Sequence, residues 1–262
     1  EMLTRQIPLL LSSNETTSLY KNGDGNRVEI ELRNDISIPH TAKNIYVGLN
    51  SASIWWTIPN IKTGVNDKLY LTHSGGSVVI TIEQGLYSLE LLNEAIRKQL
   101  LDSGLDQKVI FTGDNATQKT VIEFIEAGLQ IDFTQPDSFN NLLGYDSILI
   151  PTVPTTAQDF IYSNNVADLG NVSSFLVHTD LLAGGGITLN NSTNEVLSKV
   201  PITVSPGSLQ NYEPNHILWL PAPNLLGREL RHLTLYVTDQ LGREIIMTDD
   251  FDVILTIKFD VS

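Results

Sequence analysis

Alternation of hydrophobic and polar residues is the dominant pattern of this chain, and it predicts strands. Between Arg27 and Arg33, the hydrophobic residues Val28, Ile30 and Leu32 alternate with charged residues. In a strand, such alternation places the hydrophobic side chains on one face and the charges on the other. We therefore expect a half-exposed antiparallel strand here.

The C-terminal part of the chain contains four more runs of this kind, rich in β-branched and aromatic residues. They cover residues 216–220, 230–238, 243–248 and 251–259. Prolines, glycines and aspartates separate them, as is typical of turns between antiparallel strands. Similar runs occur earlier, at 42–56, 68–72, 77–82, 172–182 and 195–204. Roughly eight to ten strands with regular turn signals favour a β-sandwich or jelly roll.

The pattern changes between about residues 85 and 145. Hydrophobic residues recur there at helical spacing, which predicts an amphipathic helix from Leu89 to Leu100. Ser88 can cap this helix, and Gly104 can end it. Strand-like runs at 108–112, 120–125 and 129–133 follow, and then a short helix at 137–144. This stretch is therefore predicted to be a small α+β module.

Together these elements predict a mainly β protein, a jelly-roll β-sandwich with an inserted small α+β module. We expect an irregular N-terminal arm at 1–26, because Thr, Ser, Asn and Gly dominate that segment. The sandwich is expected at 27–84 and 151–262, and the inserted module at 85–150. A protein of two barrels is the alternative to this arrangement.

Composition excludes several classes of site and partner. The 262 residues include no cysteine, so disulfides, thiolate zinc sites and cysteine nucleophiles are excluded, and a reducing compartment is favoured. The formal net charge of −14 disfavours binding to nucleic acid or to an anionic membrane surface. No hydrophobic run approaches the ~18 residues of a membrane span. We expect neither nucleic acid nor a membrane span.

No catalytic or cofactor-binding motif stands out. The five histidines lack zinc-ligand spacing, and the glycines at 184–186 lack the Lys-Ser/Thr of a phosphate-binding loop. No Gly-x-Ser-x-Gly nucleophile elbow occurs. Asp249, Asp250 and Asp252 could bind calcium, but a solvated turn is the simpler interpretation. We therefore expect no enzyme activity, no catalytic residue, no metal and no cofactor.

Aromatic residues are the best candidates for contacts between subunits. Adjacent residues of a strand face opposite ways, so one of Trp55 and Trp56 is expected in the core and the other at a partner surface or in solvent. Phe160 and Tyr162 are further candidates for a subunit interface. A platform for sugar binding is the alternative for the exposed tryptophan. Trp219 is expected to lie in the core.

The order of short motifs along the chain is distinctive. The motifs are Pro59-Asn-Ile61, Gly85-Leu-Tyr-Ser-Leu-Glu-Leu-Leu-Asn-Glu-Ala-Ile96, Thr117-Gln-Lys-Thr120, Asn141-Leu-Leu-Gly-Tyr145, Val177-His-Thr-Asp-Leu-Leu182, Ser205-Pro-Gly207, Glu213-Pro214 and Leu235-Tyr-Val-Thr-Asp-Gln-Leu-Gly-Arg243. In this order they resemble the minor capsid, or penton, proteins of virophages and of Polinton-like and adintovirus-like elements. The resemblance covers about residues 45 to 260.

The resemblance implies a structural role. Proteins of this family are jelly rolls that form homopentamers at the five-fold vertices of an icosahedral capsid, beside major capsid proteins of the double-jelly-roll type. It implies a place in the virion, assembly in the host cytoplasm, and neither catalysis nor a cofactor. A jelly-roll receptor- or carbohydrate-binding domain of a viral spike is the alternative, and an enzyme built on a jelly roll is a third possibility.

Overall fold

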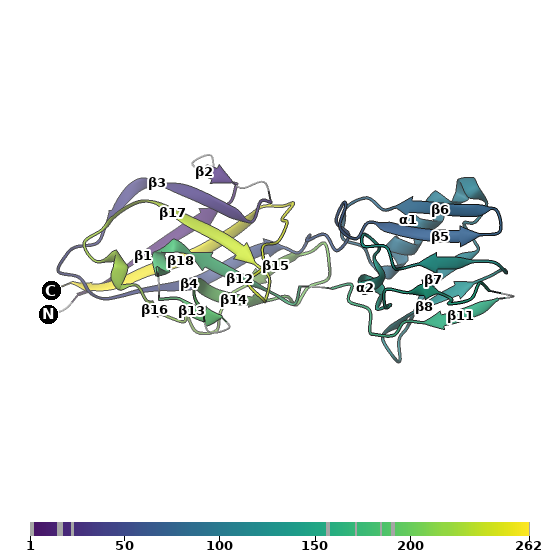
Figure 1. The fold of residues 1–262 in the computed structure, drawn as a ribbon. Coiled ribbons are helices and arrows are strands. Elements are labelled where there is room, and N and C mark those ends of the chain that lie inside the picture. The colour runs from purple at the N-terminus through teal and green to yellow at the C-terminus, as the bar shows by residue number, and fades with distance from the viewer. Residues whose placement is uncertain are drawn as a thin grey trace. The chain divides into compact units, whose positions relative to one another are not determined.

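The computed structural model describes residues 3–14, 18–21, 24–155, 158–170, 172–183, 185–189 and 192–261. Strand accounts for 47% and helix for 10%, which confirms the predicted mainly β class. The chain divides into two compact units (Figure 1). Unit 1 comprises Glu1–Ile58 and Val172–Ser262, and unit 2 comprises Pro59–Asn171.

Unit 1 is built from two antiparallel sheets. The strands of sheet A are β1 (Leu3–Ser12), β4 (Lys43–Trp55), β15 (Leu209–Tyr212), β16 (Leu220–Pro221) and β18 (Phe251–Val261). The strands of sheet B are β2 (Ser18–Lys21), β3 (Arg27–Ser37), β12 (Ser174–Thr179), β13 (Ile187–Leu189), β14 (Ser192–Pro201) and β17 (Glu229–Thr238). Sheet A has the order β1-β18-β4-β15, with β16 also paired to β4, and sheet B has the order β13-β14-β12-β17-β3-β2.

The strand order of unit 1 confirms the jelly-roll sandwich. The chain crosses repeatedly between the two sheets, for example from β3 to β4, from β14 to β15 and from β17 to β18, and its first and last strands are neighbours in sheet A. Their register runs from Leu3↔Val261 to Ser12↔Asp252, and Figure 1 shows the purple N-terminal strand beside the yellow C-terminal one. Unit 2 is inserted between β4 of sheet A and β12 of sheet B.

The core of unit 1 lies between the sheets. Inward side chains of β4, β17 and β18 are almost fully buried there, among them Val47, Leu49, Leu233, Leu235, Val253 and Leu255. In β3 the predicted alternation is confirmed, because Val28 and Ile30 are buried while Glu31 and Arg33 are exposed. The hydrophobic period of two residues is what buries one face of each strand.

The expected N-terminal arm at 1–26 is corrected by the structure. Its residues Leu3–Ser12 form β1, an edge strand of sheet A with ten paired positions. Pro8 concealed this strand in the sequence, because proline lacks the N–H that an interior strand must donate. An edge strand has a neighbouring strand on one side only. A proline whose nitrogen faces the free side removes no hydrogen bond of the sheet, so Pro8 is tolerated opposite Thr256.

Unit 2 has its own core between two further sheets. One sheet has the order β10-β9-β5-β6 and the other β11-β8-β7. Their strands are β5 (Lys68–His73), β6 (Gly76–Thr81), β7 (Val109–Asp114), β8 (Lys119–Phe124), β9 (Gln130–Asp132), β10 (Leu149–Ile150) and β11 (Asp159–Tyr162). The helices of unit 2 are α1 (Leu89–Leu100) and α2 (Asn140–Leu143), with a single 3₁₀ turn at η1 (Leu101–Ser103). Unit 1 has two 3₁₀ turns, η2 (Asp180–Leu182) and η3 (Pro223–Leu225).

The predicted helix caps are present. Ser88 Oγ accepts a hydrogen bond from Leu91 N at 3.2 Å, which begins α1. Gly104, with φ +67°, ends the 3₁₀ turn η1 that follows α1, in the left-handed conformation that glycine adopts readily. Leu92 and Ile96 of α1 are fully buried in the unit 2 core.

The unit boundaries differ from the expected module at 85–150 and sandwich at 27–84 and 151–262. The hairpin β5–β6 belongs to unit 2, because Leu69, Leu71 and Ile80 pack in the same core as α1. Strands β10 and β11 also pair within unit 2. Alternation in the sequence marks a strand but carries no information on which of two sheets it joins.

Two of the four predicted C-terminal strands are confirmed, as β17 and β18. The run 216–220 contributes only the two-residue β16, and the run 243–248 forms only an isolated bridge between Thr238 and Glu244. Residues of the first run instead lie on the outer face of sheet A, as Ile217 and Trp219 contact Gly48 of β4. Hydrophobic runs that cover a sheet have the same composition as strands within one.

Candidate functional site

Trp55 and Trp56 face opposite ways at the end of β4, as the alternation predicted. Trp56 packs against the sandwich core, and its backbone N–H donates to the Ser208 carbonyl at 3.0 Å. Trp55 occupies an outward position opposite Leu209 and is 40% exposed. Trp55 is therefore the tryptophan of this pair that is available to a partner, and its role at a subunit interface stays a prediction.

Phe160 and Tyr162 lie on β11, which is an edge strand of its sheet. They are two residues apart and share one face, with exposed fractions of 55% and 57%. Ile161 between them packs against the core of unit 2. Opposite the two aromatic residues on β8 lie Glu123 and Val121. No strand was predicted at the four-residue β11, although its exposed aromatic residues alternate with the buried side of Ile161.

The four predicted contact residues belong to two different units. Trp55 and Trp56 are in unit 1, whereas Phe160 and Tyr162 are in unit 2. Each unit thus presents its own exposed aromatic surface. The prediction that Trp219 lies in the core is wrong. Trp219 is only partly buried and lies on the outer face of sheet A. Lys258 Nζ lies 5.4 Å from the centroid of its ring.

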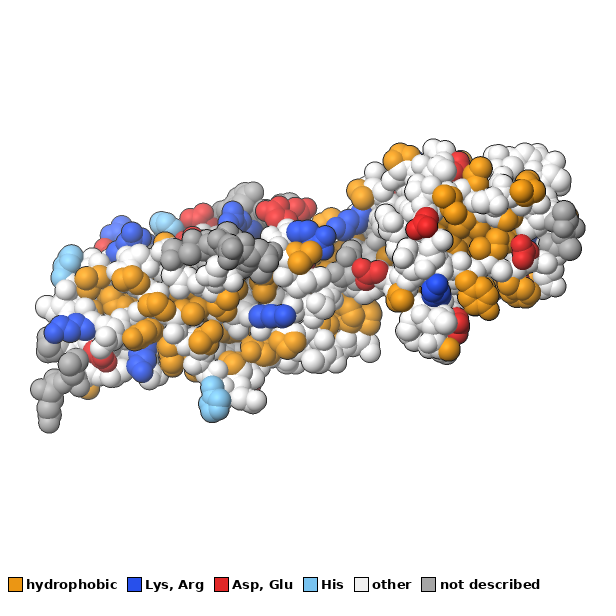
Figure 2. Space-filling view, turned by 60° about the horizontal axis from the view of Figure 1, so that its bottom comes forward, with side chains coloured by type: hydrophobic (Ala, Val, Ile, Leu, Met, Phe, Trp, Pro, Cys, Tyr) orange, Lys and Arg blue, Asp and Glu red, His pale blue; other side chains and the backbone are white. Residues whose placement is uncertain are grey.

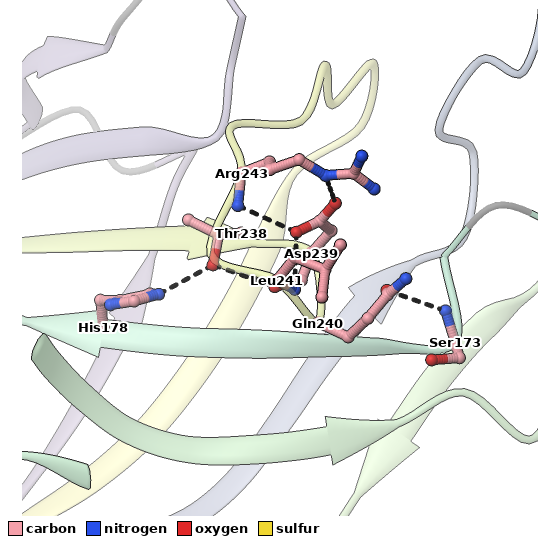
Figure 3. A network of polar contacts seen from close by, with 7 residues as sticks. All are labelled: Ser173, His178, Thr238, Asp239, Gln240, Leu241 and Arg243. Carbon is pink, nitrogen blue, oxygen red and sulfur yellow. Dashed lines mark hydrogen bonds and ion pairs between the residues drawn. The ribbon is translucent and has the colours of Figure 1, made fainter. Parts of the chain in front are cut away.

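A network of polar contacts lies at one end of β17 in unit 1 (Figure 3). Asp239 is 3% exposed, and its Oδ1 accepts hydrogen bonds from Leu241 N and Arg243 N, both at 2.9 Å. Its Oδ2 accepts from Arg243 Nε at 2.6 Å. Gln240 Oε1 accepts from Ser173 N at 3.1 Å. These contacts fix the turn after β17, so the network has a structural role.

His178 extends this network into the interior. Its Nε2 lies 2.9 Å from Thr238 Oγ1, and that hydroxyl donates to the Asp239 carbonyl. The Thr238 oxygen therefore accepts from Nε2–H, which leaves Nδ1 of His178 as the bare nitrogen. Nδ1 is buried, with no hydrogen-bond partner among the described residues. A second proton would have to sit on this buried nitrogen.

The surroundings of His178 oppose its protonation. Burial, and to a smaller extent the charge of Arg27, lower the pKa of His178 from 6.5 to about 4. The Arg27 guanidinium lies over the ring of Tyr236, 4.4 Å from its centroid. A neutral histidine with one committed hydrogen bond suits a packing role better than proton transfer. His178 lies on β12, within the run 172–182 that was predicted as a strand.

The described residues include neither a candidate metal site nor a candidate membrane-spanning helix. Within the ranges that the structure describes, no three His, Asp or Glu side chains come together as a possible metal site. His232 is close to one carboxylate alone, with Nε2 3.9 Å from Glu29 Oε1. No helix of the described segments has the length and hydrophobicity to cross a bilayer.

The chain is similar in structure to solved proteins, but not in sequence to known families. No protein-family model matches the chain, and no curated protein matches it. Among solved structures, the crystal structure of the selenomethionine-labelled mavirus penton protein is similar, with a TM-score of 0.47 and 10% sequence identity. The similarity covers 97% of this chain and 99% of that one. That protein is a penton protein, the class that the motif order of this sequence resembles.

Proposed function

We propose that this chain is a structural capsid protein whose copies form homopentamers at the five-fold vertices of an icosahedral capsid. The observation that supports this proposal is the exposure of large aromatic side chains on a strongly acidic chain. Trp55, Phe160 and Tyr162 are each at least 40% exposed, while each copy carries a net charge of −14. Copies with that charge repel one another, so their association requires hydrophobic contacts of this kind.

A five-fold ring also requires two different surfaces on each copy, because a cyclic contact joins unlike patches. Trp55 on β4 and the Phe160–Tyr162 pair on β11 belong to different sheets, so they satisfy this requirement. The resemblance in motif order supports a further partner, a major capsid protein of the double-jelly-roll type in the virion. It also supports assembly in the host cytoplasm.

The proposal is tested on the purified full chain by native mass spectrometry and negative-stain imaging. We expect particles of five copies with five-fold symmetry. The double variant Phe160→Ser/Tyr162→Ser should weaken assembly at least ~10-fold, which is the effect of losing ~1.4 kcal/mol of contact. Its matched control is Leu91→Ser/Leu101→Ser, two exposed leucines of the same unit, which should assemble like the unmodified chain.

A chain that stays monomeric at every concentration and ionic strength would overturn the proposal. Equal assembly of the aromatic variant and the leucine control would remove Phe160 and Tyr162 from the interface. Incorporation is checked separately, by co-expression with the major capsid protein and labelling of this chain in the resulting particles. Label at sites other than the vertices would contradict the proposed position.

A further inference from the structure

The two sheets of unit 1 present outer faces of very different charge. On β3 of sheet B, all five outward positions from Arg27 to Asp35 are charged. Two of them have a basic side chain nearby: Asp35 lies 3.4 Å from Arg231, and Glu29 lies 3.9 Å from the imidazole of His232. A face of this kind is well solvated, since exposed ion pairs gain little from leaving water.

The outer face of sheet A, which we call face A, is formed by the outward positions of β1, β18 and β4. On β18 its charges are confined to the ends, at Asp252 and at Lys258 and Asp260. Between them, on the same side of β18, lie Ile254 and the buried Thr256, which pair with Leu10 and Pro8 of β1. The centre of this strand pair therefore carries no charge.

A segment of chain before β16 adds to the hydrophobic character of face A. Ile217 and Trp219 lie against Gly48, at a position where a Cβ would overlap Ile217 Cγ2 and come within 3.1 Å of Trp219 Cε3. Leu218, between them in the sequence, points away from the sheet and is 58% exposed. Leu10 is 66% exposed. Figure 2 shows hydrophobic side chains gathered across the visible side of unit 1, with few acidic ones among them.

We infer that face A is the surface of unit 1 that packs against a second copy of this chain, with sheet B facing solvent. This inference rests on the proposed function and names the surface that the assembly would use. Charge is the first argument. Two copies that each carry −14 approach at least cost where neither charges nor ion pairs must be desolvated, and the centre of face A meets that condition.

Area is the second argument. The 11 residues of β18 span about 36 Å, and three strands about 4.8 Å apart span about 14 Å, so face A measures roughly 500 Å². A stable interface of standard size takes about 800 Å² from each partner. Face A therefore supplies more than half of the area that one stable contact between copies requires, and the hollow beside it extends the surface.

A hollow next to face A supplies a place for a neighbour's side chain. It has a volume of about 270 Å³ and is lined mainly by hydrophobic residues, including Ile45, Pro221, Pro223 and Leu226. Tyr46, an outward residue of β4, lines both the hollow and face A. Interfaces concentrate their binding energy where an anchor side chain fills such a pocket.

The inference is tested with the double variant Leu10→Asp/Leu218→Asp in the full chain. Its control is Leu101→Asp/Leu241→Asp, which adds the same charge at leucines that are 63% and 54% exposed and lie outside face A. By sedimentation velocity we expect the face A variant to dissociate at least 10-fold more readily than the unmodified chain. The control should assemble as the unmodified chain does, and circular dichroism should show both variants folded.

A second measurement needs no disruptive substitution. Because the chain has no cysteine, Leu218→Cys and Leu241→Cys each introduce a single thiol. In the assembled protein, maleimide should react with the thiol at position 218 at least 10-fold more slowly than in dilute monomer, while the rate at 241 should not change.

The outcomes separate this inference from the proposed function. Assembly into pentamers with equal thiol reactivity at 218 and 241, and with no effect of the Asp pair, would overturn face A and leave the pentamer proposal intact. Dimers that the Asp pair splits would support face A and contradict the pentamer. A chain that is monomeric throughout would overturn both.

Discussion

His178 and Tyr236 stack as cross-strand partners of β12 and β17, with ring centroids 4.2 Å apart and planes 11° from parallel. The other face of the Tyr236 ring carries the Arg27 guanidinium. This stack holds a neutral imidazole in the interior of a sheet, and a charge on it would be unfavourable on two counts. It would be buried, and it would lie near a permanent cation.

We predict that acid weakens unit 1 through His178. The unfolded chain protonates this residue near pH 6.5, whereas in the folded protein its pKa is about 4. Between these values the unfolded state binds more protons, so the free energy of unfolding falls as the pH falls, by about 3 kcal/mol in total. Above pH 6.5 the contribution is constant. Denaturant titrations from pH 7.5 to 4, followed by tryptophan fluorescence, measure the slope.

His178→Gln should abolish this part of the slope, because glutamine can keep the bond to Thr238 and does not titrate. The control His232→Gln alters an exposed side chain and leaves His178 in place, so the slope should persist. An unchanged slope in His178→Gln would show that other groups cause the acid sensitivity.

Gly48→Ala should destabilise unit 1 by about 1–3 kcal/mol, because the added methyl displaces Ile217 and Trp219 from face A. All three tryptophans of the chain, Trp55, Trp56 and Trp219, lie in unit 1. Their fluorescence therefore reports on this unit alone, and a red shift should accompany the lower urea midpoint. Ser51→Ala, an outward position on the same strand, is the control and should change the midpoint little.

The sequence predicted the class of fold because hydrophobic alternation is a direct consequence of one buried face per strand. It failed at β1, since Pro8 is compatible with a strand only at an edge, and edge position is a tertiary property. It also failed for residues 216–219, which cover a sheet from outside. Leu10 and Leu218 were therefore missed as contact candidates. The opposite orientations of Trp55 and Trp56, in contrast, follow from the local geometry of a strand and were predicted.

Asp239→Ala should lower the stability of unit 1 by about 1–3 kcal/mol. The buried carboxylate accepts two backbone hydrogen bonds within the turn and pairs with Arg243, and alanine replaces none of these contacts. Arg243→Gln removes only an exposed partner, since its side chain is 57% exposed, and should cost under ~1 kcal/mol. Urea titration followed by tryptophan fluorescence compares the free energy of unfolding of the two variants. Equal losses of stability would show that the ion pair alone provides the stabilisation.

In unit 2, Tyr145→Phe should cost about 1–2 kcal/mol, because its buried hydroxyl lies 2.8 Å from the Ile161 carbonyl and 3.0 Å from that of Thr120. Burial raises the pKa of this phenol, so it remains the donor throughout the neutral range. Tyr162→Phe, at an exposed position, should cost almost nothing. Hydrogen exchange of β8 and β11 amides measures the difference, and equal exchange in the two variants would contradict it.

Assembly should strengthen with moderate salt. If copies carrying −14 meet through a face with an uncharged centre, the main electrostatic effect of salt is to screen their general repulsion, whose range falls from about 30 Å at 0.01 M to about 8 Å at 0.15 M ionic strength. Sedimentation velocity across this range should show the dissociation constant falling several-fold, and equally for sodium and magnesium chloride at matched ionic strength. A constant that rises with salt would instead indicate complementary charge pairs across the contact, and it would count against face A because the centre of that face has no charges to pair.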